Sequence, residues 1–271
     1  MRVLVHCLCE NDLETRERLE KYKIPFDYIN ADSLAFDVYN DENYYTDLVS
    51  FAKNGLFIEF AEYSKEEIES ASWLIMKSRC GKISTSNDNY TFKYDCPWEK
   101  EHERFDHQTQ IREYIFDKKI VWKPKNNFYS DDSGDYSTIF CSEYARRIIS
   151  ENVNGIGFRN VLRKSTMKPR DDIFQLTFRD RLPHEALILP ENIITITCKN
   201  CCKTQYRFTQ ANNFSIKVRS AYLERKTDAY ITEDLFGEGF GYRLIIVSSK
   251  VYKVIADMKE RNIVFIPIEL V

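Results

Sequence analysis

Ile139-Phe-Cys-Ser-Glu-Tyr-Ala-Arg-Arg-Ile-Ile149 and Ile246-Val-Ser-Ser-Lys-Val-Tyr-Lys-Val-Ile-Ala256 follow one pattern of element types. Each stretch begins with a short apolar strand that ends at a serine, and serine favours the first position of a helix. The residues that follow carry one apolar stripe at helical spacing. A second apolar strand comes next in both places. The sequence therefore predicts a strand–helix–strand unit that occurs twice, and this repetition decides the expected fold.

The two units align without a gap, with residues 139–161 on residues 246–268. In this alignment the matched positions are Ile139 with Ile246, Ser142 with Ser249, Ile148 with Ile255, Ile156 with Ile263 and Phe158 with Phe265. We expect each serine to cap its helix and each matched helical isoleucine to face the sheet. Gly155 and Asn262 follow the helices, where a left-handed residue is favoured. Burial of each phenylalanine would contribute about 1.5–3 kcal/mol.

Three other segments carry clear local signals. Residues 2–8 alternate as a strand, and Asn11 or Asp12 can cap a helix over residues 13–22. Residues 55–60 predict a strand, followed by the capping box of Ser64 and Glu67. Apolar residues at helical spacing extend that helix to position 75, and residues 97–116 predict a polar surface helix.

These elements define an α+β or mixed α/β fold with two related halves. Residues 1–165 form an N-terminal α/β half that ends in the first unit. Residues 166–271 form a β-rich C-terminal half that ends in the second. Each half therefore closes on a Ser-capped strand–helix–strand unit.

The composition excludes several classes of function. The 271 residues are 30% charged with a formal net charge of −3, which gives no electrostatic reason to expect a nucleic-acid partner. No export signal and no run of about 20 apolar residues is present, so we expect a cytoplasmic protein without a membrane anchor. The eight cysteines are then reduced thiols or metal ligands rather than disulfides.

No motif in the chain indicates catalysis. His102 and His107 flank a polar stretch, but they are five residues apart, and a zinc-protease helix needs histidines four apart on one face. The Gly237-Glu-Gly-Phe-Gly241 stretch precedes a strand instead of a helix, so it predicts a turn and not a phosphate-binding loop. We therefore expect a non-catalytic protein without a cofactor.

The most specific local signal is Cys198-Lys-Asn-Cys201-Cys202. A CxxC turn has the spacing of one half of a zinc ribbon, and Cys80 or Cys96 could complete a four-ligand site. The alternative is that these cysteines are core or surface residues without metal. Cys7 and Cys9 alternate on one strand, face one side, and are equally plausible as core residues.

The last third of the chain resembles a known family. The residues that carry the resemblance are Pro183, His184, Glu185, Ile188, residues 194–198, Cys201, residues 228–239, residues 245–249 and residues 265–268. They resemble bacterial double-CxxCG motif proteins. The terminal unit is also similar to immunity proteins of polymorphic toxin systems. Two departures weaken the zinc expectation, because Cys202 stands where the family has glycine, and Cys80-Gly81 is the remnant of the first motif.

The resemblance implies an immunity protein that neutralises a cognate toxin by protein–protein contact. An acidic, aromatic surface suits a basic partner, through electrostatic steering and buried aromatic anchors. The expected contact residues are Asp131, Asp132 and Asp135 in one segment and Asp41, Glu42, Tyr44 and Tyr45 in another. The alternative function is a zinc-ribbon-like module, centred on Cys198, Cys201 and Cys202, that binds nucleic acid or protein.

Overall fold

The computed structural model describes residues 2–51, 55–78, 82–83, 91–94, 108–116, 120, 122, 126–131, 137–191, 193–198, 204–207, 216–223, 226–237 and 241–271. The chain divides into two compact units. The first contains Met1–Glu67 and Thr209–Ser215, and the second contains Ile68–Phe208 and Ile216–Val271. Both combine helices with many strands, so the fold is α+β.

The first unit is one antiparallel sheet with two helices. Its elements are β1 (Arg2–Glu10), α1 (Leu13–Lys21), β2 (Phe26–Tyr28), β3 (Ser33–Tyr39), α2 (Tyr45–Phe51) and β4 (Leu56–Glu62). The strand order is β2-β3-β1-β4, and every neighbouring pair is antiparallel. This is the β-α-β-β-α-β topology of ferredoxin-like folds.

The predicted local signals of this unit are confirmed. Asp12 caps α1, because its carboxylate accepts the backbone N–H of Thr15 at 2.7 Å. Ser64 and Glu67 form the predicted capping box, with reciprocal hydrogen bonds of 2.8 and 3.2 Å. One face of β1 and β3 packs against the helices, and Cys7 and Cys9 belong to this core.

The first strand–helix–strand unit consists of β11 (Ile139–Ser142), α4 (Glu143–Asn152) and β12 (Ile156–Arg163). A third strand, β13 (Pro169–Phe178), lies between β11 and β12 and is antiparallel to both. The sheet continues with β10 (Phe128–Asp131) and β6 (Lys82–Ile83) beyond β11, and with β9 (Ile115–Phe116) beyond β12. The two strands of the unit are thus parallel and are not adjacent.

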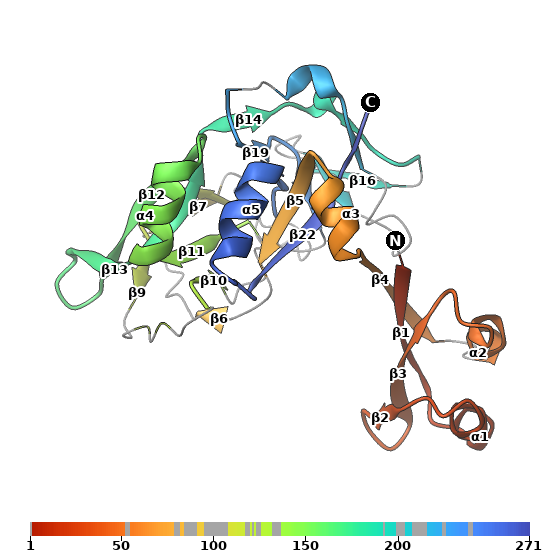
Figure 1. Ribbon diagram of the computed structural model, residues 1–271. Helices are drawn as coiled ribbons and strands as arrows, with labels where there is room; N and C mark the ends of the chain where they lie inside the picture. The colour runs from red at the N-terminus through yellow and green to blue at the C-terminus, as the bar shows by residue number, and fades with distance from the viewer. Residues whose placement is uncertain are drawn as a thin grey trace. The chain divides into compact units, whose positions relative to one another are not determined.

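The second strand–helix–strand unit has the corresponding connections. It consists of β21 (Ile245–Ser248), α5 (Ser249–Asp257) and β22 (Ile263–Pro267). The strand between them is β5 (Trp73–Ser78), which comes from far earlier in the chain. Beyond β21 lie β19 (Ala229–Thr232) and then β14 (Asp180–Leu182). Figure 1 shows α4 and α5 side by side, and the two helices pack together.

One shared core joins the two strand–helix–strand units. Its buried members include Ala145 and Ile149 of α4 and Val251 and Ile255 of α5. The central strand β5 also contributes buried residues to this core. The two helices therefore cover one continuous apolar layer.

The gapless alignment is wrong by one residue through the strand and helix. Ser248, and not Ser249, stands at the N-cap of α5, and Ile149, and not Ile148, is the buried partner of Ile255. Ser142 caps α4 as predicted, with its hydroxyl 3.2 Å from the N–H of Ala145. The Ser248 hydroxyl makes no cap bond and donates to Asp228 instead, at 2.9 Å.

The second strand–helix–strand unit has one more residue than the first between the start of its helix and the start of its second strand. Gly155 has the predicted positive φ of 88°, and a Cβ there would overlap the hydroxyl of Thr227. In the second strand–helix–strand unit the left-handed residue is Lys259, with φ 55°, and not Asn262. The second strands then return to the predicted register, so Ile156 and Phe158 do correspond to Ile263 and Phe265.

Two matched contacts tie the units together. Asn127 precedes β10, accepts the Ser142 hydroxyl at 2.9 Å, and donates its N–H to Glu260, after α5, at 2.6 Å. Asp228 precedes β19, accepts the Ser248 hydroxyl at 2.9 Å, and accepts the N–H of Asn154, after α4, at 2.9 Å. Each of the two residues therefore links the start of one helix to the end of the other.

Smaller sheets complete the second compact unit. They are formed by β7 (Phe92–Tyr94), β8 (Gln108–Gln110), β15 (Leu187–Ile188), β16 (Ile194–Thr197), β17 (Thr204–Arg207), β18 (Lys217–Val218), β20 (Leu235–Phe236) and β23 (Glu269–Leu270). Two 3-10 turns, His184–Ala186 and Ser220–Tyr222, adjoin them. The predicted richness of residues 166–271 in β-strands is therefore confirmed.

Two predicted helices differ from the structure, because the first is too long and the second is not helical where it is described. Helix α3 (Lys65–Ser70) ends before the apolar run, and residues 73–78 form the central strand β5. Leu74, Ile75 and Met76 of β5 are buried on both faces of the strand, so this part of the sequence is continuously apolar and resembles a helix. The described part of the expected helix at residues 97–116 contains the short strands β8 and β9. In the described part of the chain, no helix has the length and hydrophobicity to cross a membrane.

The corrected helix register can be tested by alanine substitution. Ile149 is buried and Ile148 is only partly buried. Ile149→Ala should lower the free energy of unfolding by about 2–5 kcal/mol, because it leaves a cavity in the shared core. Ile148→Ala, the matched control, should cost clearly less. Urea unfolding followed by circular dichroism measures both, and an equal or larger loss for Ile148→Ala would contradict the register.

Candidate functional site

Charge is divided unevenly between the two compact units. Residues 1–67 contain 15 Asp or Glu and 7 Lys or Arg, a formal net charge of −8. Residues 68–271 contain 27 Asp or Glu and 32 Lys or Arg, a formal net charge of +5. The overall charge of −3 therefore hides a strongly acidic first unit. Such a unit attracts basic molecules and accelerates their association.

The expected contact residues Asp41 and Glu42 lie in the turn after β3. Both bind the guanidinium of Arg2, with Nε 2.8 Å from Asp41 and Nη2 2.7 Å from Glu42. The guanidinium also lies 3.7 Å from the centre of the Tyr39 ring. The hydrogen bond that Arg2 donates to the Asp41 carboxylate raises the pKa of Arg2. The side chain of Asp41 stays 57% exposed, so the cluster is ordered and still accessible to a partner.

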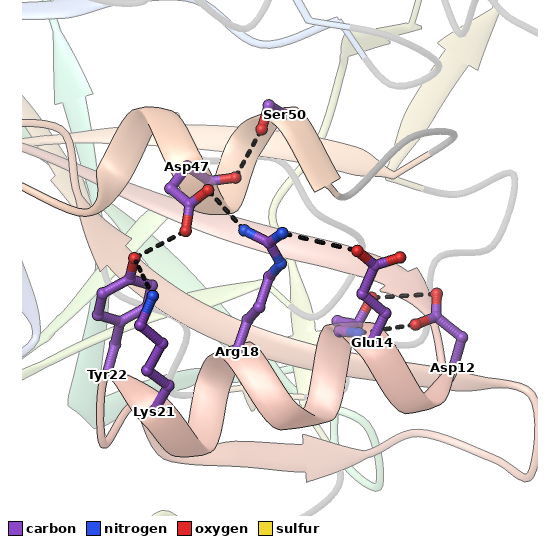
Figure 2. A network of polar contacts seen from close by, with 8 residues as sticks. Asp12, Glu14, Arg18, Lys21, Tyr22, Asp47 and Ser50 are labelled. Carbon is purple, nitrogen blue, oxygen red and sulfur yellow. Dashed lines mark hydrogen bonds and ion pairs between the residues drawn. The ribbon is translucent and has the colours of Figure 1, made fainter.

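The neighbouring tyrosines have structural roles. Tyr44 is half-buried and stacks on Tyr22 with ring centres 5.1 Å apart, and Tyr45 opens α2. Figure 2 shows Asp47 between Tyr22 and Arg18, with hydrogen bonds of 2.7 and 2.5 Å. The Tyr22 hydroxyl and then Arg18 lower the pKa of Asp47. These contacts fix α2 on α1 and hold the acidic turn in one position.

The second expected contact segment is only partly described. Asp131 ends β10, whereas Asp132 and Asp135 lie outside the described residues. This segment therefore stays a prediction, and the acidic turn at Asp41 and Glu42 is the better defined candidate.

Three of the five expected metal ligands lie in the sequence between β16 and β17. Cys198 directly follows β16 and is buried, and Thr197 pairs with Thr204 of β17. Cys201 and Cys202 belong to the connection between these strands, which lies outside the described residues. Cys80 and Cys96 lie outside them as well. In the parts of the chain that are described, no group of three metal-ligating side chains is found.

Three other thiols are buried in apolar surroundings. Burial, with smaller contributions from Cys9 and Asp37, raises the pKa of Cys7 to about 12. Burial raises the pKa of Cys9 to about 11 and also raises that of Cys141. The reactive form of a cysteine is the thiolate, so these cysteines are protected core residues. Of the two readings of Cys7 and Cys9, the core position is the one observed.

Residues that carry the family resemblance meet in space. Nδ1 of His184 lies 2.9 Å from the carboxylate of Asp234, whose side chain is only 13% exposed. The His184 ring stacks on Tyr206 with centres 5.6 Å apart and planes 11° apart. Burial and then Asp234 raise the pKa of Tyr206. Nothing in the spacing of these residues could have shown the contact, because they are 50 and 22 positions apart.

Lys77 is a further perturbed residue that sequence reasoning missed. It belongs to the central strand β5 and is half-buried. Desolvation lowers its pKa, and its ammonium lies 5.9 Å from the centre of the Tyr242 ring. The apolar run around it gave no sign that one lysine would be enclosed.

Comparison of the chain with known protein families, curated proteins and solved structures found no match. The double-CxxCG resemblance therefore stays a prediction. His102 and His107 lie outside the described residues.

The protected thiols predict a pattern of labelling. At pH 8, pKa values of about 12 and 11 leave roughly one Cys7 in ten thousand and one Cys9 in a thousand ionised. Iodoacetamide should therefore leave both unlabelled in the native protein and label both in guanidinium, as peptide mass spectrometry can show. Equal rates in the two states would contradict the burial.

The same shifts set a pH dependence of stability. The folded-state pKa values lie above the ordinary thiol pKa of 9.0, so the stabilising contribution is complete below pH 9. It is lost as the pH rises toward 11–12, because the unfolded thiols ionise first. Cys7→Ser would remove its share of this alkaline slope.

Proposed function

We propose that this protein is a non-catalytic binding protein of the immunity type, which neutralises a cognate toxin by protein–protein contact in the cytoplasm. The observation that carries the proposal is the net charge of −8 on residues 1–67, together with the accessible acidic turn at Asp41 and Glu42. The complementary partner is a basic protein, such as an enzyme that acts on nucleic acid.

The geometry of the turn supports this partner. Arg2 already occupies part of the carboxylate pair and lies over the Tyr39 ring. An arginine of the partner could bind the same carboxylates in a bidentate manner and stack on the same aromatic face. Arg2 thus marks the kind of side chain that the surface accepts. Residues Tyr22, Tyr44 and Asp47 hold the turn in place beforehand, which lowers the entropic cost of binding.

A second candidate function is the zinc-ribbon-like module. The observation that favours it is the hairpin of β16 and β17, because zinc knuckles present their cysteines on such connections. Cys198, Cys201 and Cys202 would supply thiolates, with Cys80 or Cys96 as the fourth ligand. Zinc would then stabilise the hairpin and enable it to bind nucleic acid or protein.

We further propose that the two strand–helix–strand units are copies of one ancestral unit, at the ends of two related halves. The support is their matching connections, with an antiparallel strand between the two parallel strands in each. The matched contacts of Asn127 and Asp228 add to it.

The binding proposal predicts an electrostatically steered complex. The test partner is any basic protein whose gene adjoins this one, and the measurement is surface plasmon resonance at several salt concentrations. The association rate should fall with added salt. Asp41→Lys with Glu42→Lys should reduce it by about tenfold or more at low salt.

The matched control is Asp27→Lys with Asp32→Lys, two exposed carboxylates elsewhere on the same unit. It changes the net charge equally and should affect the rate less. An equal effect would show attraction by total charge and contradict a site at Asp41 and Glu42. No complex at all would contradict the proposed function.

The zinc alternative predicts about one equivalent of zinc in protein purified without chelator, because structural sites hold their metal tightly. Plasma emission spectroscopy measures it, and Cys201→Ser with Cys202→Ser should remove it. Cys7→Ser is the control, because Cys7 lies in the core of the first unit. Less than about half an equivalent would reject the zinc module.

A further inference from the structure

The sheet of the first compact unit has one face that its two helices leave open. Helices α1 and α2 both lie on the other side of the sheet (Figure 1), where Leu19 and Leu48 pack against Val5. Side chains alternate along a strand, so the even-numbered residues of β1 point away from these helices. The register places them beside odd-numbered residues of β3 and even-numbered residues of β4. We call this surface the open sheet face, and its members are Arg2, Leu4, His6 and Leu8 of β1, Asp37 and Tyr39 of β3 and Leu56 of β4.

The leucines of the open sheet face are accessible to solvent. Leu56 is 49% exposed, and it pairs with Leu8, which is half-buried like Leu4. Among the residues that the structure describes, Leu4 and Leu8 belong to no apolar core cluster. Accessible leucines gathered on one sheet face are typical of a surface that binds another protein.

A histidine–aspartate pair lies between the leucines. His6 stands between Leu4 and Leu8 on β1, and its Nδ1 is 2.7 Å from the carboxylate of Asp37. The Asp37 side chain stays 57% exposed, so a partner can reach this carboxylate. The face therefore offers a negative charge within an apolar surround.

The open sheet face continues into the acidic turn. Tyr39 pairs with Leu4, and the guanidinium of Arg2 lies over the Tyr39 ring at 3.7 Å. The same guanidinium binds Asp41 and Glu42 in the turn. The leucines and the accessible carboxylates therefore form one continuous surface, about 20 Å long because strand residues rise about 3.4 Å each.

We infer that the open sheet face is the docking surface for a segment of the basic partner that carries apolar side chains beside arginine or lysine. The inference rests on the proposed function, because it names the part of the protein that would hold that partner. The apolar side chains of the segment would cover the leucines, and Asp37 and the acidic turn would bind its cations. A second copy of this chain suits the face less well, because residues 1–67 carry a net charge of −8 and two such units repel each other.

Calorimetric titration of the full chain with short synthetic peptides tests the inference without the natural partner. The probe is a peptide of alternating arginine and leucine, and its matched forms are an arginine–serine peptide and a glutamate–leucine peptide. The arginine–leucine peptide should bind about tenfold more tightly than the arginine–serine peptide, because only the former can cover the leucines. The glutamate–leucine peptide should not bind. Proton–nitrogen NMR spectra should show shifts at the backbone amides of β1 and β3.

Leu8→Thr and Leu56→Thr should each raise the dissociation constant of the arginine–leucine peptide by about tenfold. Threonine favours strands, so both variants are compatible with the sheet. The matched control is Leu13→Thr, which changes a leucine that is 63% exposed on α1, and it should leave the affinity within about twofold. Thermal unfolding shows whether each variant is folded. Asp37→Asn, which should weaken binding by about threefold, replaces any variant that is not.

Equal affinities of the arginine–serine and arginine–leucine peptides would overturn the inference, because charge alone would then explain binding. An equal loss in Leu13→Thr, or NMR shifts confined to α1 and α2, would also overturn it. A dimer of the chain in analytical ultracentrifugation that Leu8→Thr disrupts would assign the face to a second copy instead. The proposed function fails separately, if no basic protein whose gene adjoins this one forms a complex. A complex that Leu8→Thr and Leu56→Thr leave unchanged contradicts the docking surface alone.

Discussion

The second compact unit is held together by two hydrogen bonds, which Asn127 and Asp228 accept from serine hydroxyls at the starts of α4 and α5. Each of these residues binds a serine at the N-terminus of one helix and a loop after the other helix, at 2.6–2.9 Å. The polar groups at these four helix ends have these partners only when both helices are in place. Formation of one strand–helix–strand unit therefore favours formation of the other.

The apolar packing follows the same arrangement. Ile149 and Ile255 lie in one core, and the strands that complete the two sheets come from opposite directions along the chain. β13 follows its unit at once, whereas β5 precedes its unit by about 170 residues, as the sequence numbering shows. The second strand–helix–strand unit can thus pair with β5 only after most of the chain is available, and its strand pairings are strongly non-local.

These long-range pairings explain what could be predicted from the sequence. Caps are local, so Asp12, Ser64 and Ser142 were identified correctly from a few neighbouring residues. The state of residues 73–78 depends on β21 and β22, so an apolar run looked helical. The one-residue offset at Ser248 was invisible because adjacent isoleucines and serines fit either register. The contact of His184 with Asp234 depends on tertiary structure in the same way.

Ion pairs contribute to the position of the acidic turn in the first compact unit. In the acidic first unit, Arg2 and Arg18 are neutralised by nearby carboxylates, and these pairs position the turn at Asp41 and Glu42.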